Sequence, residues 1–175
     1  MNKKRYYLGI VLRYLILILI ALPNLYLFYL IFTPLTIYPV YFLLNLFFNA
    51  QLVQNTILVN GINIEIISAC VAGSAYYLLL ILNLTTPNLL LKQRLKMIFL
   101  SFTALLALNV LRILILVLIL LLSPSLFDIT HKVFWYAISI LFVILIWFSQ
   151  VKFYKIKQIP VYSDIRQLIL FSKSD

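Results

Sequence analysis

Three residues in this chain of 175 have the side chains that acyl transfer requires: Cys70, Arg112 and His131. Cys70 lies where a helix is predicted to begin, and the free N–H groups and dipole of a helix start favour a thiolate. Arg112 lies inside a long apolar stretch, where an arginine costs about 2.5–3.5 kcal/mol and is usually sustained by a partner or a watery cavity. A thiol, a proton-carrying ring and a cation correspond to the nucleophile, proton shuttle and oxyanion stabiliser of acyl transfer.

Two further polar residues accompany these three. Asn109 lies three residues before Arg112 on the same helix face and is predicted to hold the guanidinium or a water molecule beside it. Asp128 lies three residues before His131 and is predicted to orient the ring or to cap the helix. The sequence is also compatible with a structural Arg112 bonded to backbone carbonyls and with an inert Cys70.

The composition predicts a membrane protein. Apolar residues make up 65% of the chain and charged residues 10%, with a mean hydropathy of +1.12, against roughly 45–50% and 25% in soluble domains. A water-soluble globule is therefore excluded, and at about 20 residues per span the length allows four or five helices. We predict an all-α polytopic protein that forms a single membrane domain, 1–175, in contact with membrane lipids.

The same counts exclude several other classes of function. The net charge of +10 is dispersed between the apolar runs, so there is no basic folded surface for nucleic acid. The chain has one cysteine and one histidine, which rules out an internal disulfide and a Cys/His metal cluster. With three glycines and no glycine-rich phosphate loop, no cofactor is predicted.

Apolar runs predict four membrane-spanning helices at about 8–32, 69–84, 97–122 and 133–150, with a kink in the first at Pro23. Basic residues cluster before the first span, between the second and third, and after the fourth. The positive-inside rule places these clusters in the cytoplasm. We therefore predict a cell-membrane protein with both termini cytoplasmic and Cys70 and His131 on the outer face. The tail, 151–175, is predicted to contain a helix on anionic lipid, capped by Ser163.

The outer segment, 33–68, is predicted to hold two short elements. The apolar stretch after Pro39, within 34–50, is too short to span and predicts a re-entrant or interfacial helix. The alternative is an additional span, which would invert the N-terminus.

The second short element is a β-hairpin around Asn60-Gly61, between two β-branched runs. Leu58 is predicted to oppose Ile62, and Ile64 to face away from Asn63 and Glu65. The alternative is a plain connector.

The depth of Arg112 constrains the site. Arg112 lies ten residues before Leu122, about 15 Å of helix below its outer end. Cys70 must therefore lie below the outer surface, or the span must end earlier. A water-accessible funnel in the outer leaflet is predicted to satisfy both.

Three blocks of the sequence resemble one family. Ala69-Cys70-Val71-Ala72-Gly73 resembles an Ala-Cys-Ser/Thr-Gly block, Asn109-Val-Leu-Arg112 matches an Asn-x-x-Arg block, and His131 stands where a histidine begins the next helix. In order and spacing over about 50–150, the chain resembles the exosortase/archaeosortase family of multi-pass membrane cysteine proteases, in its compact archaeal-type form.

The resemblance implies roles for three residues: Cys70 as nucleophile, Arg112 as transition-state stabiliser and His131 as the proton-transfer residue. It also implies exported substrate proteins with a C-terminal hydrophobic sorting signal, cleaved on the outer face of the membrane. Whether water or an acceptor resolves the intermediate stays open, as does the identity of any acceptor. The alternative is a small non-enzymatic membrane protein, such as a transporter subunit or an assembly factor.

Overall fold

The computed structural model describes residues 3–87 and 89–172 and shows a mostly helical chain. Within these residues, four helices are long and apolar enough to cross a membrane: Tyr26–Phe48, Ser68–Thr85, Leu91–Leu122 and Pro124–Phe153. A small three-stranded antiparallel sheet accompanies them. The predicted class is therefore confirmed, and the chain is a mainly helical, multi-pass membrane protein.

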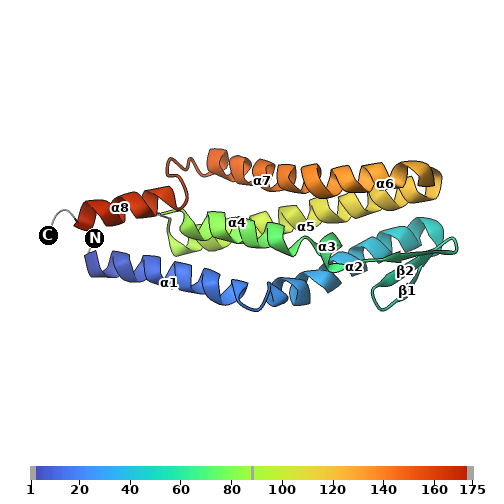
Figure 1. Ribbon diagram of the computed structural model, residues 1–175, viewed down its shortest axis with the longest axis horizontal. Coiled ribbons are helices and arrows are strands. Elements are labelled where there is room, and N and C mark those ends of the chain that lie inside the picture. The colour runs from blue at the N-terminus through green and yellow to red at the C-terminus, as the bar shows by residue number, and fades with distance from the viewer. Residues whose placement is uncertain (1–2, 88, 173–175) are drawn as a thin grey trace.

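The helices form an elongated bundle in which the chain runs up and down four times (Figure 1). The first pass contains two helices end to end, the second a single turn and a helix, and the third one 32-residue helix. The fourth pass is a continuous helix with a π-helical segment, and a final helix lies at the end of the bundle where the chain starts. In order they are α1 (Lys3–Ala21), α2 (Tyr26–Phe48), α3 (Ser68–Val71), α4 (Gly73–Thr85), α5 (Leu91–Leu122), α6 (Pro124–Val133), η1 (Phe134–Ile138), α7 (Ser139–Phe153) and α8 (Tyr162–Ser172).

The predicted first span, 8–32, is wrong in its bounds. The chain leaves the helix between α1 and α2 because Asn24 and Leu25 are left-handed, with φ of 50° and 60°, directly after a proline that cannot donate a backbone hydrogen bond. The separate outer helix predicted in 34–50 is also wrong, since those residues up to Phe48 continue α2. Because α1 and α2 lie end to end and run in the same direction, residues 34–48 do not add a separate pass. The predicted orientation of the N-terminus is therefore unaffected.

The predicted hairpin is confirmed, but its register differs. β2 (Thr56–Val59) pairs with β3 (Ile62–Glu65), and Asn60 and Gly61 form the turn with φ of 50° and 81°. A two-residue turn with both φ values positive pairs its flanking residues directly, so Ile62 lies opposite Val59 instead of Leu58. A third strand, β1 (Gln51–Val53), pairs with β2 and was not predicted.

The sheet packs against the halves of two helices that lie away from the chain termini. Ile57 and Val59 of β2 are fully buried, and Asn63 and Glu65 on the other face of β3 are exposed, as the alternation predicted. The buried face belongs to one apolar cluster with residues of α2 and α5, among them Val40, Leu44, Ile66, Val110, Ile113 and Val117. The sheet is therefore attached to the membrane domain and does not fold alone.

A second apolar cluster fills the part of the bundle between the sheet and the chain termini and is rich in aromatic rings. Phe32 of α2 stacks on Tyr76 of α4 with ring centroids 3.7 Å apart, and Phe102 of α5 packs edge-on against both rings. These contacts fix α4 between α2 and α5. The position of α4 is what sets the level of Cys70, which lies just before it.

The other three spans also begin at residues other than those predicted. The span predicted at 69–84 is divided at Ala72, whose φ of 61° ends α3. The span predicted at 97–122 begins at Leu91 and ends at Leu122 as expected. The span predicted at 133–150 begins at Pro124, because Ser123 alone separates α5 from α6 and a proline fits the first turn of a helix.

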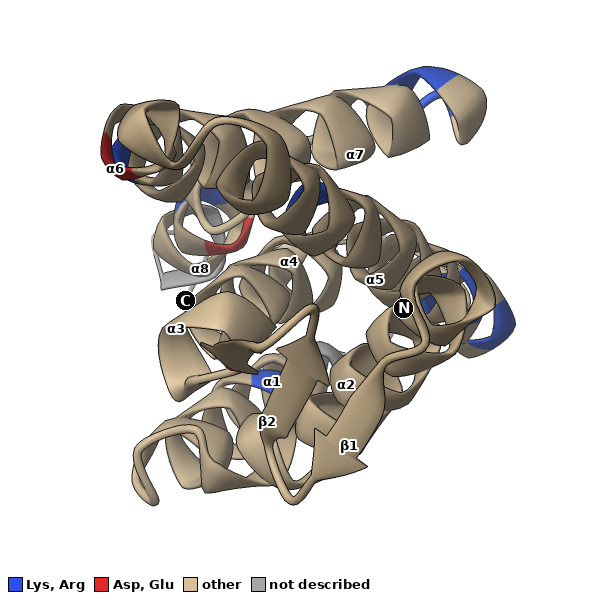
Figure 2. Ribbon diagram, turned by 90° about the vertical axis from the view of Figure 1, so that its right-hand side faces the viewer, with Lys and Arg blue, Asp and Glu red and all other residues tan. Residues whose placement is uncertain are grey.

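Basic residues gather at one end of the bundle. Figure 2 looks along the molecule from the sheet end and shows Lys and Arg at the far end of α7. Lys152 lies in the last turn of that helix, and Arg94 lies in the first turn of α5 at the same end. The clusters predicted to be cytoplasmic therefore lie together.

The end of α4 and the final helix are held at this basic end by two arginines. Arg94 donates to the carbonyls of Asn83, Leu84 and Thr86. Arg13 of α1 donates to Leu84 and pairs with the buried Asp164 of α8 at 3.2 Å.

The tail and its predicted cap differ slightly from the sequence reading. α7 extends to Phe153, so the tail predicted at 151–175 starts three residues later. Ser163 lies inside α8, where its hydroxyl accepts from the N–H of Ile159, so it is not the residue before the helix.

Candidate active site

Cys70 lies in a single helical turn between the sheet and α4. Its N–H donates to the carbonyl of Ile67 at 2.8 Å, and Ala72 ends the turn in the left-handed conformation. The thiol is free and half-buried. The sequence placed Cys70 in the first turn of a span, but that turn is α3 alone, and the long helix begins three residues later at Gly73.

Asn109 fixes the backbone of α3, the single helical turn that contains Cys70 and is called the cysteine turn below. Its side-chain amide, 2% exposed, donates from Nδ2 to the carbonyl of Cys70 at 2.8 Å. Among the described residues, no hydrogen bond joins Asn109 to the Arg112 guanidinium, and the alternative of a water molecule beside Asn109 stays a prediction. Asn109 instead ties Cys70 to α5, the helix that also carries Arg112.

Arg112 lies on the same face of α5, one turn farther from the basic end. Its side chain is 6% exposed, and its Nη1 donates to the Ser139 hydroxyl at 2.7 Å. Its positive charge lies within electrostatic range of the Cys70 sulfur. The structure therefore brings the predicted nucleophile and the predicted cation together.

Ser139 is the site residue that the sequence analysis missed. It follows the π-helical segment η1 and lies in the apolar run assigned to the fourth span. A lone serine in such a run is not distinctive, because serine often bonds back to its own helix in spans. One signal could have pointed to Ser139. A buried arginine such as Arg112 requires a partner, and Ser139 is one of the few polar residues of the fourth span.

His131 lies apart from the other two predicted residues. Its ring stacks between Phe127 and Trp135, with centroids 5.4 and 6.5 Å away. It lies in the last turn of α6, so the prediction that it opens a helix is wrong. Within the described part of the chain, no hydrogen bond or ion pair joins His131 to Cys70 or Arg112.

Asp128 does not have either role predicted for it. It is exposed on α6, and the residue that precedes this helix is Ser123. Among the described residues, no hydrogen bond joins Asp128 to the His131 ring. Asp128 therefore neither caps the helix nor orients the histidine.

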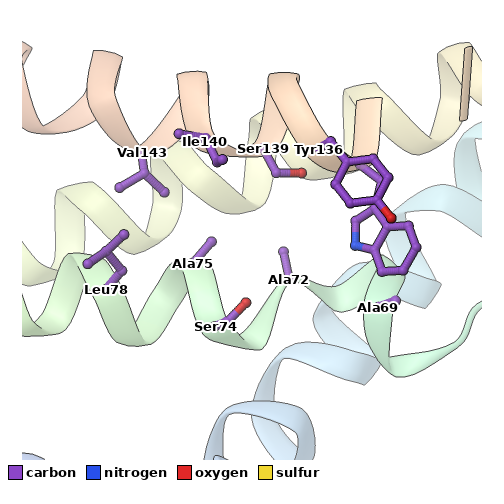
Figure 3. Close-up of a pocket in the computed structure, with 10 residues that line it drawn as sticks. Ala69, Ala72, Ser74, Ala75, Leu78, Tyr136, Ser139, Ile140 and Val143 are labelled. Atoms are coloured by element: carbon purple, nitrogen blue, oxygen red, sulfur yellow. The ribbon is translucent and has the colours of Figure 1, made fainter. Parts of the chain in front are cut away.

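A cavity of about 280 Å³ lies between α3 and α4 on one side and η1 and α7 on the other (Figure 3). Ala69, Ala72 and Ala75 line one wall, with Ser139 opposite them. Cys70, Arg112 and His131 are not among its lining residues.

Each of these three residues nevertheless adjoins, in sequence or by contact, a residue that lines the cavity. Ala69 precedes Cys70, Ser139 bonds Arg112, and Trp135 stacks on His131. The cavity is therefore lined by a neighbour of each candidate residue and not by the three residues themselves.

No protein-family model, curated protein or solved structure matches this chain. In the part that the structure describes, no three His, Cys, Asp or Glu side chains are grouped as a metal site would require. The geometry of Cys70, Asn109, Arg112 and Ser139 is therefore the main evidence about the chemistry of the site.

Proposed function

We propose that this chain is a membrane-embedded cysteine peptidase or transpeptidase of the exosortase/archaeosortase type. It cleaves exported proteins beside a C-terminal hydrophobic sorting signal, at the outer face of the cell membrane. Cys70 is the nucleophile, Arg112 stabilises the developing negative charge, and His131 is the proton donor. The resemblance in sequence supplies the reaction class, and the surroundings of Arg112 carry the proposal.

Arg112 differs from Arg94 and Arg13, the two arginines at the basic end, in how many hydrogen-bond partners its N–H donors have. Arg94 reaches three backbone carbonyls, and Arg13 reaches two carbonyls at the end of α4, those of Leu84 and Thr86, and pairs with Asp164. Arg112 bonds one neutral hydroxyl, and its buried Nε has no partner among the described residues.

An arginine that only supports the fold is expected to have its donors filled, because unfilled buried donors cost about 1–3 kcal/mol each. An under-used cation beside the single cysteine of the chain is suited to charge that appears during a reaction. This contrast with Arg94 favours a chemical role for Arg112 over a structural one.

The proposed reaction has two stages. The Cys70 thiolate forms a bond to the carbonyl carbon of the substrate, and Arg112 stabilises the oxyanion of the tetrahedral intermediate. The intermediate collapses, the C–N bond breaks, and the departing amine takes a proton from His131. Water, or an amine or hydroxyl acceptor, then attacks the thioester and gives a proton to His131. The C–S bond breaks, the product leaves, and the Cys70 thiolate is regenerated.

His131 must come closer to the reacting bond than it lies in the free protein. It stacks on Trp135, a residue of the cavity wall, so substrate in the cavity would lie next to that stack. Catalytic hydrogen bonds are often long in free enzymes and shorten in the substrate complex. The present separation is therefore compatible with proton transfer to a bound substrate.

The level of the site agrees with cleavage near the outer surface. Lys96 lies in the basic end of α5, and Arg112 lies sixteen residues farther, about 24 Å along the helix. The hydrocarbon core is about 30 Å thick. If the core begins at Lys96, Arg112 lies about 6 Å below its outer boundary, close to where an anchored substrate leaves the membrane.

The decisive experiment compares the C-termini of exported proteins in the native host. Strains carry the wild-type chain, Cys70→Ala, Arg112→Gln or the control Ser149→Ala. Ser149 is an exposed serine of α7 that bonds its own helix at Leu145. Mass spectrometry of C-terminal peptides should find proteins that lose their hydrophobic terminal segment in the wild type and control and keep it in the other two. If Cys70→Ala leaves every C-terminus unchanged, the enzymatic proposal is wrong and the non-enzymatic alternative stands.

The single cysteine also allows a direct test of topology. A charged, membrane-impermeant methanethiosulfonate reagent added to intact cells should label Cys70. A chain with Cys70→Ala and Lys157→Cys should be labelled only after the cells are opened, because Lys157 lies at the basic end. Labelling of Cys70 only in opened cells would contradict an outward-facing site.

A further inference from the structure

We propose that Ser139 is the positioning residue for Arg112, and that the π-helical segment η1 exists to present its hydroxyl to that arginine. This inference rests on the proposed function, since it concerns the same cation. It adds a residue outside the three blocks that resemble the family. It also assigns a role to the π-helical segment in the fourth pass.

The hydrogen bonds of Ser139 have a fixed direction. Its Oγ donates its one hydrogen to the carbonyl of Phe134 at 3.1 Å. A hydroxyl has one donor and two acceptor positions, so the lone pairs remain for Arg112, whose Nη1 donates at 2.7 Å. The hydroxyl is thereby held as an acceptor that faces a guanidinium, which can only donate.

The π-helical segment supplies the carbonyl that fixes this direction. The backbone N–H of Ser139 also bonds the carbonyl of Phe134, five residues earlier instead of the usual four. One carbonyl therefore receives both the N–H and the hydroxyl of Ser139. Single π-helical turns within α-helices are frequent at functional sites because they re-aim a side chain.

Other hydroxyls in the same pass lack this arrangement. Ser149 and Thr130 each donate to a carbonyl four residues earlier in their own helix, and both hydrogen bonds are exposed. They are the ordinary back-bonded hydroxyls of membrane helices. Ser139 differs in two ways, since it bonds five residues back and accepts from a charged group on another helix.

Ser139 also lies between Arg112 and the cavity. Its side chain lines the cavity wall opposite Ala72 (Figure 3) and accepts from Arg112, which is not among the lining residues. Without the hydroxyl, the guanidinium is free to leave its place near Cys70. When two unit charges move from about 4 to about 6 Å apart at an effective dielectric of about 20, the loss of attraction corresponds to a roughly tenfold change in an equilibrium constant.

The test measures the rate of alkylation of Cys70 by N-ethylmaleimide near neutral pH, in the purified full chain. Ser139→Ala should slow alkylation by up to roughly tenfold. Ser139→Thr keeps a hydroxyl and should stay close to the wild type. The matched control is Ser149→Ala, which removes a serine hydroxyl from the same helix away from Arg112.

A double-mutant cycle separates positioning from a structural role. If Ser139 acts through Arg112, Ser139→Ala should cause no additional change in a chain that already carries Arg112→Gln. An unchanged alkylation rate in Ser139→Ala, with an intact fold, would overturn the inference. An equal additional change in the Arg112→Gln background would also overturn it.

The alkylation assay uses no substrate, so its result is independent of the C-terminal processing test. Slower alkylation in Ser139→Ala together with normal processing in Cys70→Ala would refute the proposed enzyme and still support the positioning of Arg112. If both proposals hold, processing in Ser139→Ala should fall by roughly 10- to 100-fold, the usual effect of a small misplacement of a catalytic group.

Discussion

Substitution of Gly73 by alanine should destabilise the protein and disturb the cysteine turn. Gly73 begins α4, directly after the left-handed Ala72. A Cβ built on Gly73 would lie 2.8 Å from Cε1 and Cζ of the Tyr29 ring. Carbon atoms pack best at about 3.5–4.0 Å, so the ring or the start of α4 must move by roughly 0.7 Å.

The expected cost follows from this displacement. Overpacking of this kind typically costs about 1–3 kcal/mol, and the better helix propensity of alanine returns up to about 1 kcal/mol. We expect a net loss of about 1–2 kcal/mol, which for a chain of this size lowers Tm by about 2–8 °C at roughly 2–4 °C per kcal/mol. Because Gly73 lies three residues after Cys70, the rate of Cys70 alkylation should also change.

The assay is thermal unfolding of the purified chain in detergent, followed by tryptophan fluorescence. The control is Gly9→Ala in α1, where an added Cβ meets no atom within 4 Å, so Tm should stay constant or rise. In a Tyr29→Ala chain the obstructing ring is gone, and Gly73→Ala should then cost little. An unchanged or higher Tm for Gly73→Ala, or equal costs with and without the Tyr29 ring, would refute the reasoning.

Two further substitutions test the supports of the bundle and of the site. Asp164→Asn removes the buried carboxylate that pairs with Arg13. Loss of one partner of a buried pair costs about 3–5 kcal/mol, so limited proteolysis should release α8. The control is Asp128→Asn at an exposed position, which should not change the digest. Asn109→Leu keeps a buried side chain but removes the donor to the Cys70 carbonyl, which costs about 1–3 kcal/mol. Processing of substrate proteins should fall, while Cys70 should still react with the thiol reagent. Normal processing in Asn109→Leu would show that the turn containing Cys70 does not need this hydrogen bond.

The sequence predicted the class of fold because a prediction from composition and hydropathy requires few assumptions about how the helices pack. Asn60-Gly61 also predicted the hairpin, since a turn with positive φ at both central residues favours this pair. The register of the hairpin was available from the same rule but was placed one residue away. By contrast, β1 ends at a turn that contains Gln54 with φ of 54° and no glycine, so no local signal marks that strand.

The bounds of the helices were less predictable because prolines have two opposite effects here. Pro34 and Pro39 remain inside α2, as prolines can in membrane helices. Pro23 precedes a true break, and Pro124 begins a helix. Hydrophobicity alone cannot separate these cases, because packing against the other helices decides which proline interrupts the chain.

The partners of the candidate site residues were predictable only in part. The positions of Cys70 and Arg112 in consecutive passes predicted that they meet, and the structure brings them within electrostatic range. The partner of Asn109 is a backbone carbonyl in a turn of four residues, and the partner of Arg112 depends on a π-helical segment. Both depend on backbone irregularities that hydrophobic periodicity does not report.

The sheet has a direct role in placing the proposed nucleophile. Ile66 lies four residues before Cys70 and is 2% exposed, in the same apolar cluster as Val110 and Ile113 of α5. Asn109 and Arg112 each adjoin one of these two residues along α5. The sheet therefore anchors the chain just before Cys70, and Asn109 anchors Cys70 itself, to one turn of a single helix. Because that helix also carries Arg112, the distance between thiol and cation is set by a rigid element and not by the flexible connections between passes, as a preorganised charge-stabilising site requires.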